Sequence, residues 1–212
     1  MELSEAIRRR RMVRAFTREA ITSADLDAVL EVMRHAPSAG FTQGLDLLVL
    51  HGEGDVTRFW ETTFPPAQRE LLPTQLAVAA PVVVLPLVSR QAYLDRYSEP
   101  DKAAAGMQEE SGWPIPYWHV DAGMAVMLAL LTAVERGLGA WFFAVVHGER
   151  ELLGSLGVPA ERRLLGALAL GHAAQADGGR GSAATRPRRS MESMLRPARW
   201  VGRSGDLVGV GS

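Results

Sequence analysis

The clearest alternation of apolar and polar positions lies between residues 22 and 36. Its apolar members recur at helical spacing among charged side chains, at Leu26, Val29, Leu30 and Met33. This spacing predicts an amphipathic helix. Thr22 and Asp25 have the spacing of a capping box at its start, although that motif more often uses Glu or Gln at the second position. Pro37 and Gly40 are expected to end the helix.

Four apolar runs predict strands. They are "LDLLVLH" at 45–51, "PVVVLPLV" at 81–88, "AWFFAVV" at 140–146 and "RRLLGALALGH" at 162–172. Pro86 favours an edge strand or a strand end, because proline has no N–H to give to a sheet. The continuous apolar character of the last run indicates burial on both faces.

Three more helices are expected. Ser4 can cap a first helix that runs toward Met12, and "ERELLGSLGV" predicts a short helix. The third is long and apolar, spans roughly 119–136, and is ended by Gly137 and Gly139. Its helically spaced apolar stripe is expected to be core, at Met124, Met127, Leu128, Leu131 and Val134. The most apolar part, 120–134, is about 15 residues long, short of the roughly 20 that a bilayer requires, so a buried core helix is predicted and no membrane span.

The order of these elements predicts the fold class. Strands and helices intermix without strict βαβ alternation, which favours an α+β sheet packed with helices. Residues 89–118 are polar and then rich in aromatic residues and proline, and this stretch is too long for a simple connector. It is expected to form a lid or to be helical in part.

Composition narrows the chemistry. The 212-residue chain has a formal net charge of −1, which argues against a nucleic-acid partner. It has no cysteine, which removes disulfides, thiolate catalysis and cysteine metal sites. The five histidines show no metal-binding spacing, so no metal is predicted. The acidic start "MELSE" is unlike a secretory leader, and a cytoplasmic protein is expected.

Local positive charge stands out against this neutral balance. "RRRRMVRAF" at 8–16 holds five arginines, and "RPRRS" at 186–190 forms a second cluster. Arg10 and Arg14 would repel each other on one helical face, so a compensating anion is expected. Guanidinium groups bind phosphate oxygens in pairs, and both clusters could converge on one phosphate. The alternative is a solvated basic helix end that pairs with nearby glutamates.

Two further stretches could line a ligand. In "APSAGFTQG" at 36–44, small residues permit close backbone approach to a flat molecule, and Gln43 offers both a donor and an acceptor. The alternative is a plain helix-to-strand loop. The three aromatic residues of "GWPIPYW", which are Trp113, Tyr117 and Trp118, could stack on a flat substrate or pack a dimer.

The four stretches "RRRMVRAF", "APSAGFTQG", "VDAGMAVMLALLTAVERGLGAWF" and "RPRRSMES" occur in that order along nearly the whole chain. This combination resembles the FMN-dependent nitroreductase family, whose members typically read R-R-S-x-R-x-F, A-P-S-x-x-N-x-Q-P, a long apolar helix ending in G-L-G, and a late K/R-x-R. The resemblance implies a three-layer α/β/α fold with a central, mostly antiparallel sheet flanked by helices, in a domain-entwined homodimer. It implies one FMN-binding domain over 1–212, with 89–118 as a possible lid or excursion and about 190–212 as a C-terminal extension.

The resemblance also implies which residues contact the cofactor. The phosphate and ribityl chain would be held by Arg10, with Arg11 beside it, and by Arg186 and Arg188. Arg14 would lie near the flavin pyrimidine edge, where its positive charge would stabilise the anionic reduced ring. Main chain near Ala144 and Val145 would face flavin N5, and Gln75 is the candidate for the O2 side. The flavin would be lined, from the same or the partner chain, by Ser38, Ala39, Gly40 and Gln43.

Three positions depart from the family pattern. Met12 stands where the family usually has Ser, so one hydroxyl to the phosphate is lost. Phe41 replaces the usual Asn, and Gly44 replaces the usual Pro. The family's acidic residue near N5 is also absent. Substrate contacts are expected from Phe41, Trp113, Tyr117, Trp118 and Phe142.

The activity that the resemblance implies needs no catalytic side chain, because the cofactor carries the chemistry. FMN would take a hydride at N5 from NADH or NADPH and pass it to a nitroaromatic, a quinone or a similar conjugated acceptor in ping-pong fashion. Two alternatives stay open. A deazaflavin could replace nicotinamide as donor, or the protein could be a non-catalytic flavin-binding, storage or sensing protein.

Overall fold

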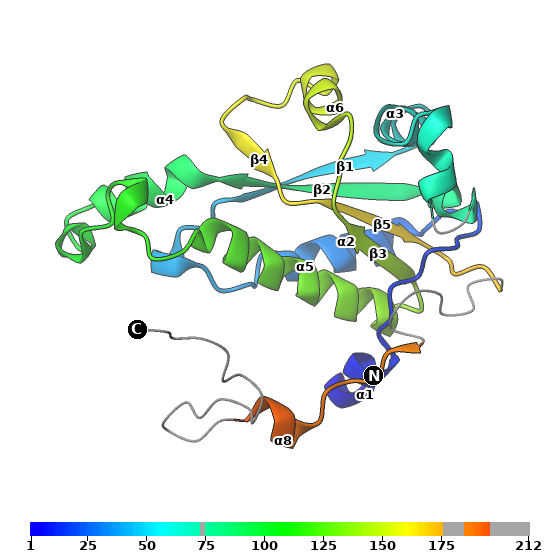
Figure 1. Ribbon diagram of the computed structural model, residues 1–212, viewed down its shortest axis with the longest axis horizontal. Helices are drawn as coiled ribbons and strands as arrows, with labels where there is room; N and C mark the ends of the chain where they lie inside the picture. Colours follow the sequence, from blue (N-terminus) through cyan, green and yellow to red (C-terminus); the bar gives the residue numbers. More distant parts are fainter. Residues whose placement is uncertain (73–74, 176–184, 196–212) are drawn as a thin grey trace, which may run out of the picture. The chain divides into compact units, whose positions relative to one another are not determined.

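A computed structural model describes residues 1–72, 75–175 and 185–195 of the chain (Figure 1). The chain divides into two compact units, Met1–Gly179 and Arg180–Ser212. The expectation of one domain over 1–212 stays a prediction, as does the C-terminal extension, of which residues 196–212 lie outside the described part.

The first unit is built on a five-stranded sheet. Its strands are β1 (Leu45–His51), β2 (Val82–Ser89), β3 (Gly139–Phe143), β4 (Arg162–Leu164) and β5 (Ala167–Gly171). Every ladder is antiparallel, in the order β1-β2-β5-β3, and β4 also pairs with β2. The predicted α+β class is confirmed.

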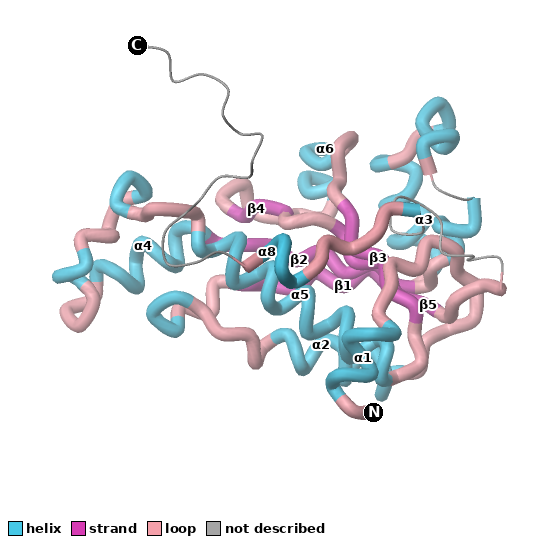
Figure 2. Tube along the Cα trace, turned by 60° about the horizontal axis from the view of Figure 1, so that its bottom comes forward, coloured by secondary structure: helices cyan, strands magenta, loops and turns pink. Residues whose placement is uncertain are grey.

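Helices cover both faces of this sheet (Figures 1 and 2). On one face α2 (Ser23–Met33) and α5 (Tyr117–Glu135) pack against β2 and β5, and on the other α3 (Glu53–Thr63) and α6 (Glu149–Ser155) enclose a second core. The predicted three-layer arrangement is therefore confirmed. The shorter helices are α1 (Leu3–Arg9), α4 (Arg90–Ser98), α8 (Met191–Met194), and the 3-10 turns η1 (Ala39–Phe41), η2 (Pro66–Leu71), η3 (Gln75–Ala79), η4 (Ala103–Ala105) and η5 (Glu110–Gly112).

The apolar runs predict the strands well, with two corrections. β2 is an inner strand with all eight residues buried, so the expectation that Pro86 marks an edge or a strand end is wrong. The proline is tolerated because it stands where the neighbour of β2 changes from β5, which pairs with residues 82–84, to β4, which pairs with residues 87–89. At that point Leu165 N–H donates to the Pro86 carbonyl, 3.0 Å away, a bond that needs no N–H from the proline.

The second correction concerns residues 162–172, which form two strands and not one. Gly166 separates them, with a φ of +155°. A Cβ atom built there would lie 2.7 Å from the Phe143 carbonyl oxygen, so only glycine fits this crossing. β5 is buried along its whole length, as predicted, whereas β4 is half-exposed.

Residues 8–16, called the arginine segment below, are helical over a shorter stretch than expected. α1 ends at Arg9, and Ser4 lies inside it, while the N-cap is Glu2 without a side-chain cap. Residues 13–17 instead extend along β3 and past β5: Val13 N–H donates to the Ala140 carbonyl at 2.9 Å, and Phe16 bridges to Ala173. Arg10 and Arg14 therefore do not share a helical face, and the expected repulsion at helical spacing does not arise.

The predicted helix at 22–36 is confirmed. Thr22 caps α2 by accepting the Asp25 N–H at 3.1 Å, and its hydroxyl donates to the Asp25 carboxylate at 2.7 Å. Val29 and Met33 are buried in the predicted stripe. The helix ends at Met33, before Pro37.

α5 turns a different face to the core than expected. Its buried positions are Trp118, Asp121, Ala122, Ala125, Val126, Ala129, Leu130 and Ala133. Met124 and Met127 of the predicted core stripe are 37% and 39% exposed, and the rest of that stripe is half-buried. Within the described residues, α5 is the one helix whose length and hydropathy would also allow it to cross a membrane. Core helices of globular proteins meet the same criteria, and 44% of its most apolar window is buried.

Residues 89–118 are helical in part, which is one of the two expected outcomes. The segment contains α4, η4 and η5, and it packs its own aromatic core. Trp113 and Trp118 are buried there with Tyr93. The ring centroids of the two tryptophans lie 5.8 Å apart.

Candidate functional site

The N-terminal arginines flank a buried anchor, Val13. Val13 is buried against Gly139, where a Cβ atom would lie 2.7 Å from the valine Cγ1. Three residues before this anchor, the Nη1 atom of Arg10 is buried and has no hydrogen-bond partner among the described residues. A buried guanidinium nitrogen without an acceptor is costly, by about 1–3 kcal/mol, so Arg10 is placed to receive an anion.

The neighbouring arginines have other surroundings. Arg14 is half-buried and donates from Nη1 to the Met12 carbonyl at 3.3 Å. Arg11 is exposed. Arg186 and Arg188 lie in the second unit, before α8, and both are exposed. The described structure does not test the expectation that the two clusters converge.

The loop at 36–44 has an unusual backbone held by short contacts. Ser38 Oγ accepts the Gln43 N–H at 3.0 Å, and the Thr42 hydroxyl donates to the Ala39 carbonyl at 2.6 Å. Gly40, Phe41 and Gln43 all have positive φ, of 61°, 56° and 55°. For a residue with a side chain this left-handed conformation costs about 1–2 kcal/mol, and the loop therefore needs external support.

The support comes from α4 and α5. The Ala39 N–H donates to the carboxylate of Asp121 on α5, 2.8 Å away, and the Tyr93 hydroxyl on α4 donates to the same oxygen at 2.8 Å. Burial, with the hydrogen bond to Asp121 second, raises the pKa of Tyr93 well above its usual value. Arg96 Nε donates to the Gly40 carbonyl at 2.9 Å.

Sequence reasoning missed this network. One signal was available: Asp121 is a charged residue at the start of an otherwise apolar run, and such a residue needs a hydrogen-bonding partner when it is buried. Nothing in the local sequence points to Tyr93 or Arg96 as its companions.

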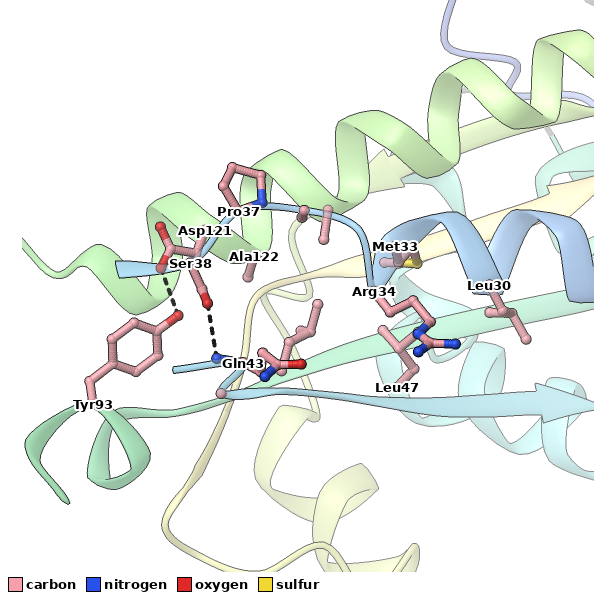
Figure 3. Close-up of a pocket in the computed structure, with 14 residues that line it drawn as sticks. Leu30, Met33, Arg34, Pro37, Ser38, Gln43, Leu47, Tyr93, Asp121 and Ala122 are labelled. Atoms are coloured by element: carbon pink, nitrogen blue, oxygen red, sulfur yellow. Dashed lines mark hydrogen bonds between the residues drawn. The ribbon is translucent and has the colours of Figure 1, made fainter. Parts of the chain in front are cut away.

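A pocket of about 200 Å³ lies between this loop, α2, β1 and α5 (Figure 3). It brings together two predicted site residues, Ser38 and Gln43, with Tyr93 and Asp121, and its other walls are largely apolar. Phe41 does not line it and is 74% exposed.

Residues 144 and 145, which follow β3, are only partly covered by the rest of the chain. Ala144 is exposed, and Val145 is half-buried against the core under α3 and α6. Phe142, on the opposite face of β3, packs against the core under α2 and α5. At a rise of about 3.4 Å per residue, Ala144 lies roughly 14 Å along the chain from Ala140, where the arginine segment pairs.

The other predicted site residues have structural contacts of their own. Gln75 is exposed, and its side-chain amide donates to the Arg69 carbonyl at 3.1 Å. Trp113 donates from its indole nitrogen to the Met107 carbonyl at 2.8 Å. Trp113 and Trp118 thus belong to the core of the 89–118 segment, and of the three aromatic candidates there only Tyr117 is half-exposed.

The arginine segment and the 36–44 loop meet opposite ends of α5. The loop contacts Asp121, whereas Arg11 and Val13 line a small pocket together with Val134. Asp121 and Val134 are 13 positions apart (134 − 121), which at about 1.5 Å per residue is roughly 20 Å. Within one chain the two predicted halves of the site are therefore far apart.

The chain is similar in fold to several solved structures. The FMN complex of a nitroreductase candidate from Desulfovibrio desulfuricans is 24% identical with a TM-score of 0.67, over 95% of this chain and 99% of that one. A nitroreductase with bound FMN from Bacteroides fragilis is 20% identical with a TM-score of 0.61, over all of both chains. A nitroreductase-like protein from Streptococcus mutans is 18% identical with a TM-score of 0.68, over 92% and 97%.

At these identities the similarity to solved structures is one of fold, and no curated protein matches the sequence. The family model for the Nitroreductase family matches residues 7–172. That match spans the arginine segment, the 36–44 loop, α5 and the strands on either side of them. The chain belongs to the Nitroreductase family.

Proposed function

We propose that this protein is an FMN-dependent oxidoreductase that uses NADH or NADPH to reduce a flat, conjugated acceptor such as a nitroaromatic or a quinone. The observation that carries the proposal is the buried Nη1 of Arg10, which has no hydrogen-bond partner in the described part of the chain. It stands at the motif position that holds the flavin phosphate in this family. A phosphate oxygen would supply the acceptor that this nitrogen lacks.

The residues of the chain would bind and orient the cofactor. Arg10 and Arg11, with Arg186 and Arg188, would hold the phosphate, while Arg14 would place a positive charge beside the ring. Main-chain groups at Ala144 and Val145 would face N5, and Gln75 would reach the ring after giving up its present bond to Arg69. When bound, the flavin would supply the redox chemistry, which is hydride transfer from the nicotinamide to the second substrate.

We infer that the working form is a homodimer that shares each site between two chains. The distance of roughly 20 Å along α5 between the arginine segment and the 36–44 loop supports this. The outward face of α5 carries Val120, Met124 and Met127, which are 40%, 37% and 39% exposed. An apolar face of this kind on a central helix is a natural contact between protomers. A two-fold dimer across it would bring the partner's Ser38, Ala39, Gly40 and Gln43 toward these arginines.

The substrate side would be lined by aromatic side chains. Phe41 is the strongest candidate, because its ring is exposed and stands where the family usually has a small amide. Tyr117 and Phe142 are half-buried and would form adjoining walls, whereas Trp113 and Trp118 would contribute from the core behind them. A stack of flat rings favours flat substrates.

The deciding experiment is an absorbance spectrum of the purified protein, with FMN added if none is bound, before and after anaerobic NADPH or NADH. Flavin bands that bleach on addition are the expected result. Bands that persist with both nucleotides would refute nicotinamide as the donor and favour a deazaflavin donor or a non-catalytic flavin-binding protein. Failure to bind FMN would refute the proposal as a whole.

A further inference from the structure

The 36–44 loop is held from outside by α4 and α5, through main-chain atoms and not through the side chains that would meet a ligand. We propose that Tyr93, Asp121 and Arg96 are positioning residues, which fix the main chain at Ala39 and Gly40 and thereby place Phe41 on the substrate side of the site. The proposal rests on the flavin function proposed above for the role of Phe41. The bracing of the loop itself does not depend on a cofactor.

We call the contacts of Tyr93, Asp121 and Arg96 with the loop the brace, and Asp121 is at its centre. Asp121 is 5% exposed, and one carboxylate oxygen accepts both the Ala39 N–H and the Tyr93 hydroxyl. Figure 3 shows the bond from Tyr93. No Lys, Arg or His lies within ion-pair distance of it among the described residues. A buried carboxylate without a cation depends on its hydrogen-bond donors, so loss of the tyrosine hydroxyl leaves Ala39 as the sole donor.

Arg96 holds the peptide group that joins Gly40 to Phe41. Its Nε donates to the Gly40 carbonyl at 2.9 Å, and its two terminal nitrogens each bind the Asp101 carboxylate at 2.7 Å. The bidentate pair fixes the guanidinium plane. The arginine side chain is only 22% exposed, so its orientation is set by these partners and by packing.

The two contacts act on the peptide groups on either side of the one that joins Ala39 to Gly40, and the second of them leads directly into Phe41. The side chain of Phe41 is 74% exposed, so its direction is set by its own backbone and not by packing. That backbone is left-handed, with a φ of 56°. Gly40 also packs against the Tyr97 ring, where an added Cβ would lie 2.8 Å from Cε2. Releasing Ala39 or Gly40 would let the phenylalanine ring move from its place.

Hydrogen exchange on the cofactor-free protein tests the brace directly. Tyr93→Phe removes only the hydroxyl, and Arg96→Lys removes the bidentate geometry. Each is expected to raise amide exchange in a peptide covering 36–44 by about fivefold, the factor that one lost hydrogen bond implies. Tyr97→Phe is the matched control, since this tyrosine lies on the same helix beside Gly40 and its hydroxyl makes no hydrogen bond to the described residues. Unchanged exchange in both variants, or an equal rise in the control, overturns the proposal.

A double-mutant cycle on the FMN-loaded enzyme tests the consequence. Tyr93→Phe is expected to raise the KM for a quinone acceptor several-fold with a smaller change in kcat, and to have no further effect in a Phe41→Ala background. Additive effects would show that Tyr93 does not act through Phe41. Should Tyr93→Phe not fold, Arg96→Lys takes its place in the same cycle. A wild-type chain that binds no FMN refutes the proposed function and the substrate role of Phe41 together, while hydrogen exchange still decides whether the brace exists.

Discussion

Replacing Arg10 by methionine should have opposite effects on the free protein and on cofactor binding. Methionine keeps an apolar stem of similar length but removes the guanidinium, whose Nη1 is buried without a partner among the described residues. In the free protein this removes an unsatisfied donor. In the FMN-bound protein it removes a charge-assisted hydrogen bond to phosphate.

The magnitudes follow from the burial of that one atom. An unsatisfied buried donor costs about 1–3 kcal/mol. Because the arginine as a whole is only half-buried, we take about 1 kcal/mol, which raises Tm by roughly 2–4 °C for a chain of this size. A hydrogen bond between charged groups is worth about 1.5–3 kcal/mol, so the Kd for FMN should rise by about ten- to a hundredfold.

The assay consists of two measurements, each made on Arg10→Met and on a control variant. FMN fluorescence quenching gives Kd, and a thermal melt of the cofactor-free protein gives Tm. Arg9→Met is the control, because Arg9 is exposed and pairs with Glu5 at 3.2 Å on the surface of α1. A Kd within twofold of wild type for Arg10→Met, or an equal loss in the control, would refute the phosphate assignment. Adding Arg188→Ala to Arg10→Met should abolish retention of FMN through purification.

Three further predictions concern stability, assembly and pH. Gly44→Ala should destabilise the fold by about 1–3 kcal/mol in a urea melt, because the new Cβ would lie 2.7 Å from the Tyr93 ring. Met127→Lys on the outward face of α5 should convert a dimer to monomers in light scattering. His119 is exposed overall, but partial desolvation of its ring lowers its pKa, so protonation opposes folding and stability should fall as pH drops below about 6.5. His119→Gln should reduce the loss of Tm between pH 7.5 and 5.5.

The strands and α2 were predictable because their signals are local. A continuous apolar run indicates a strand that is buried on both faces, as β5 is. The helical spacing of Val29 and Met33 indicates which side of α2 packs against the sheet. Gly166 was harder, because one glycine in an apolar run does not reveal whether a strand bends or stops. The decisive fact is the Phe143 carbonyl 2.7 Å from where its Cβ would be, and that carbonyl belongs to another strand.

The orientation of α5 could not be predicted from periodicity. Both of its faces are apolar, and the larger residues, such as Met124 and Met127, were expected to be core. The sheet and α2 instead pack against Ala125, Ala129 and Ala133. Small side chains let the helix approach its neighbours closely, and the bulkier apolar residues remain on the outer face. A hydrophobic pattern gives two candidate faces, and only the shape of the neighbouring elements selects between them.

The brace on the 36–44 loop was missed for a related reason. Asp121 and Ala39 are 82 positions apart, and Tyr93 and Asp121 are 28 apart. No local pattern links such residues. The sequence identifies the loop through its small residues, but the contacts that give it a fixed shape depend on how α4 and α5 fold back toward it.

These placements make α5 the element on which several proposed properties of the site depend. Its inner face packs the sheet through alanines, its first turns hold the 36–44 loop through Asp121, and its outer face presents Met124 and Met127. Asp121 and Met124 are only three positions apart, so they are neighbours on the helix surface, with Asp121 buried and Met124 37% exposed. In a homodimer formed across the outer face, any shift of α5 that repacks the protomer contact would also move the carboxylate that holds Ala39. Dimer contact and loop position would then be coupled through one rigid helix, so substitutions at Met124 are expected to change acceptor KM even though this residue does not line the pocket.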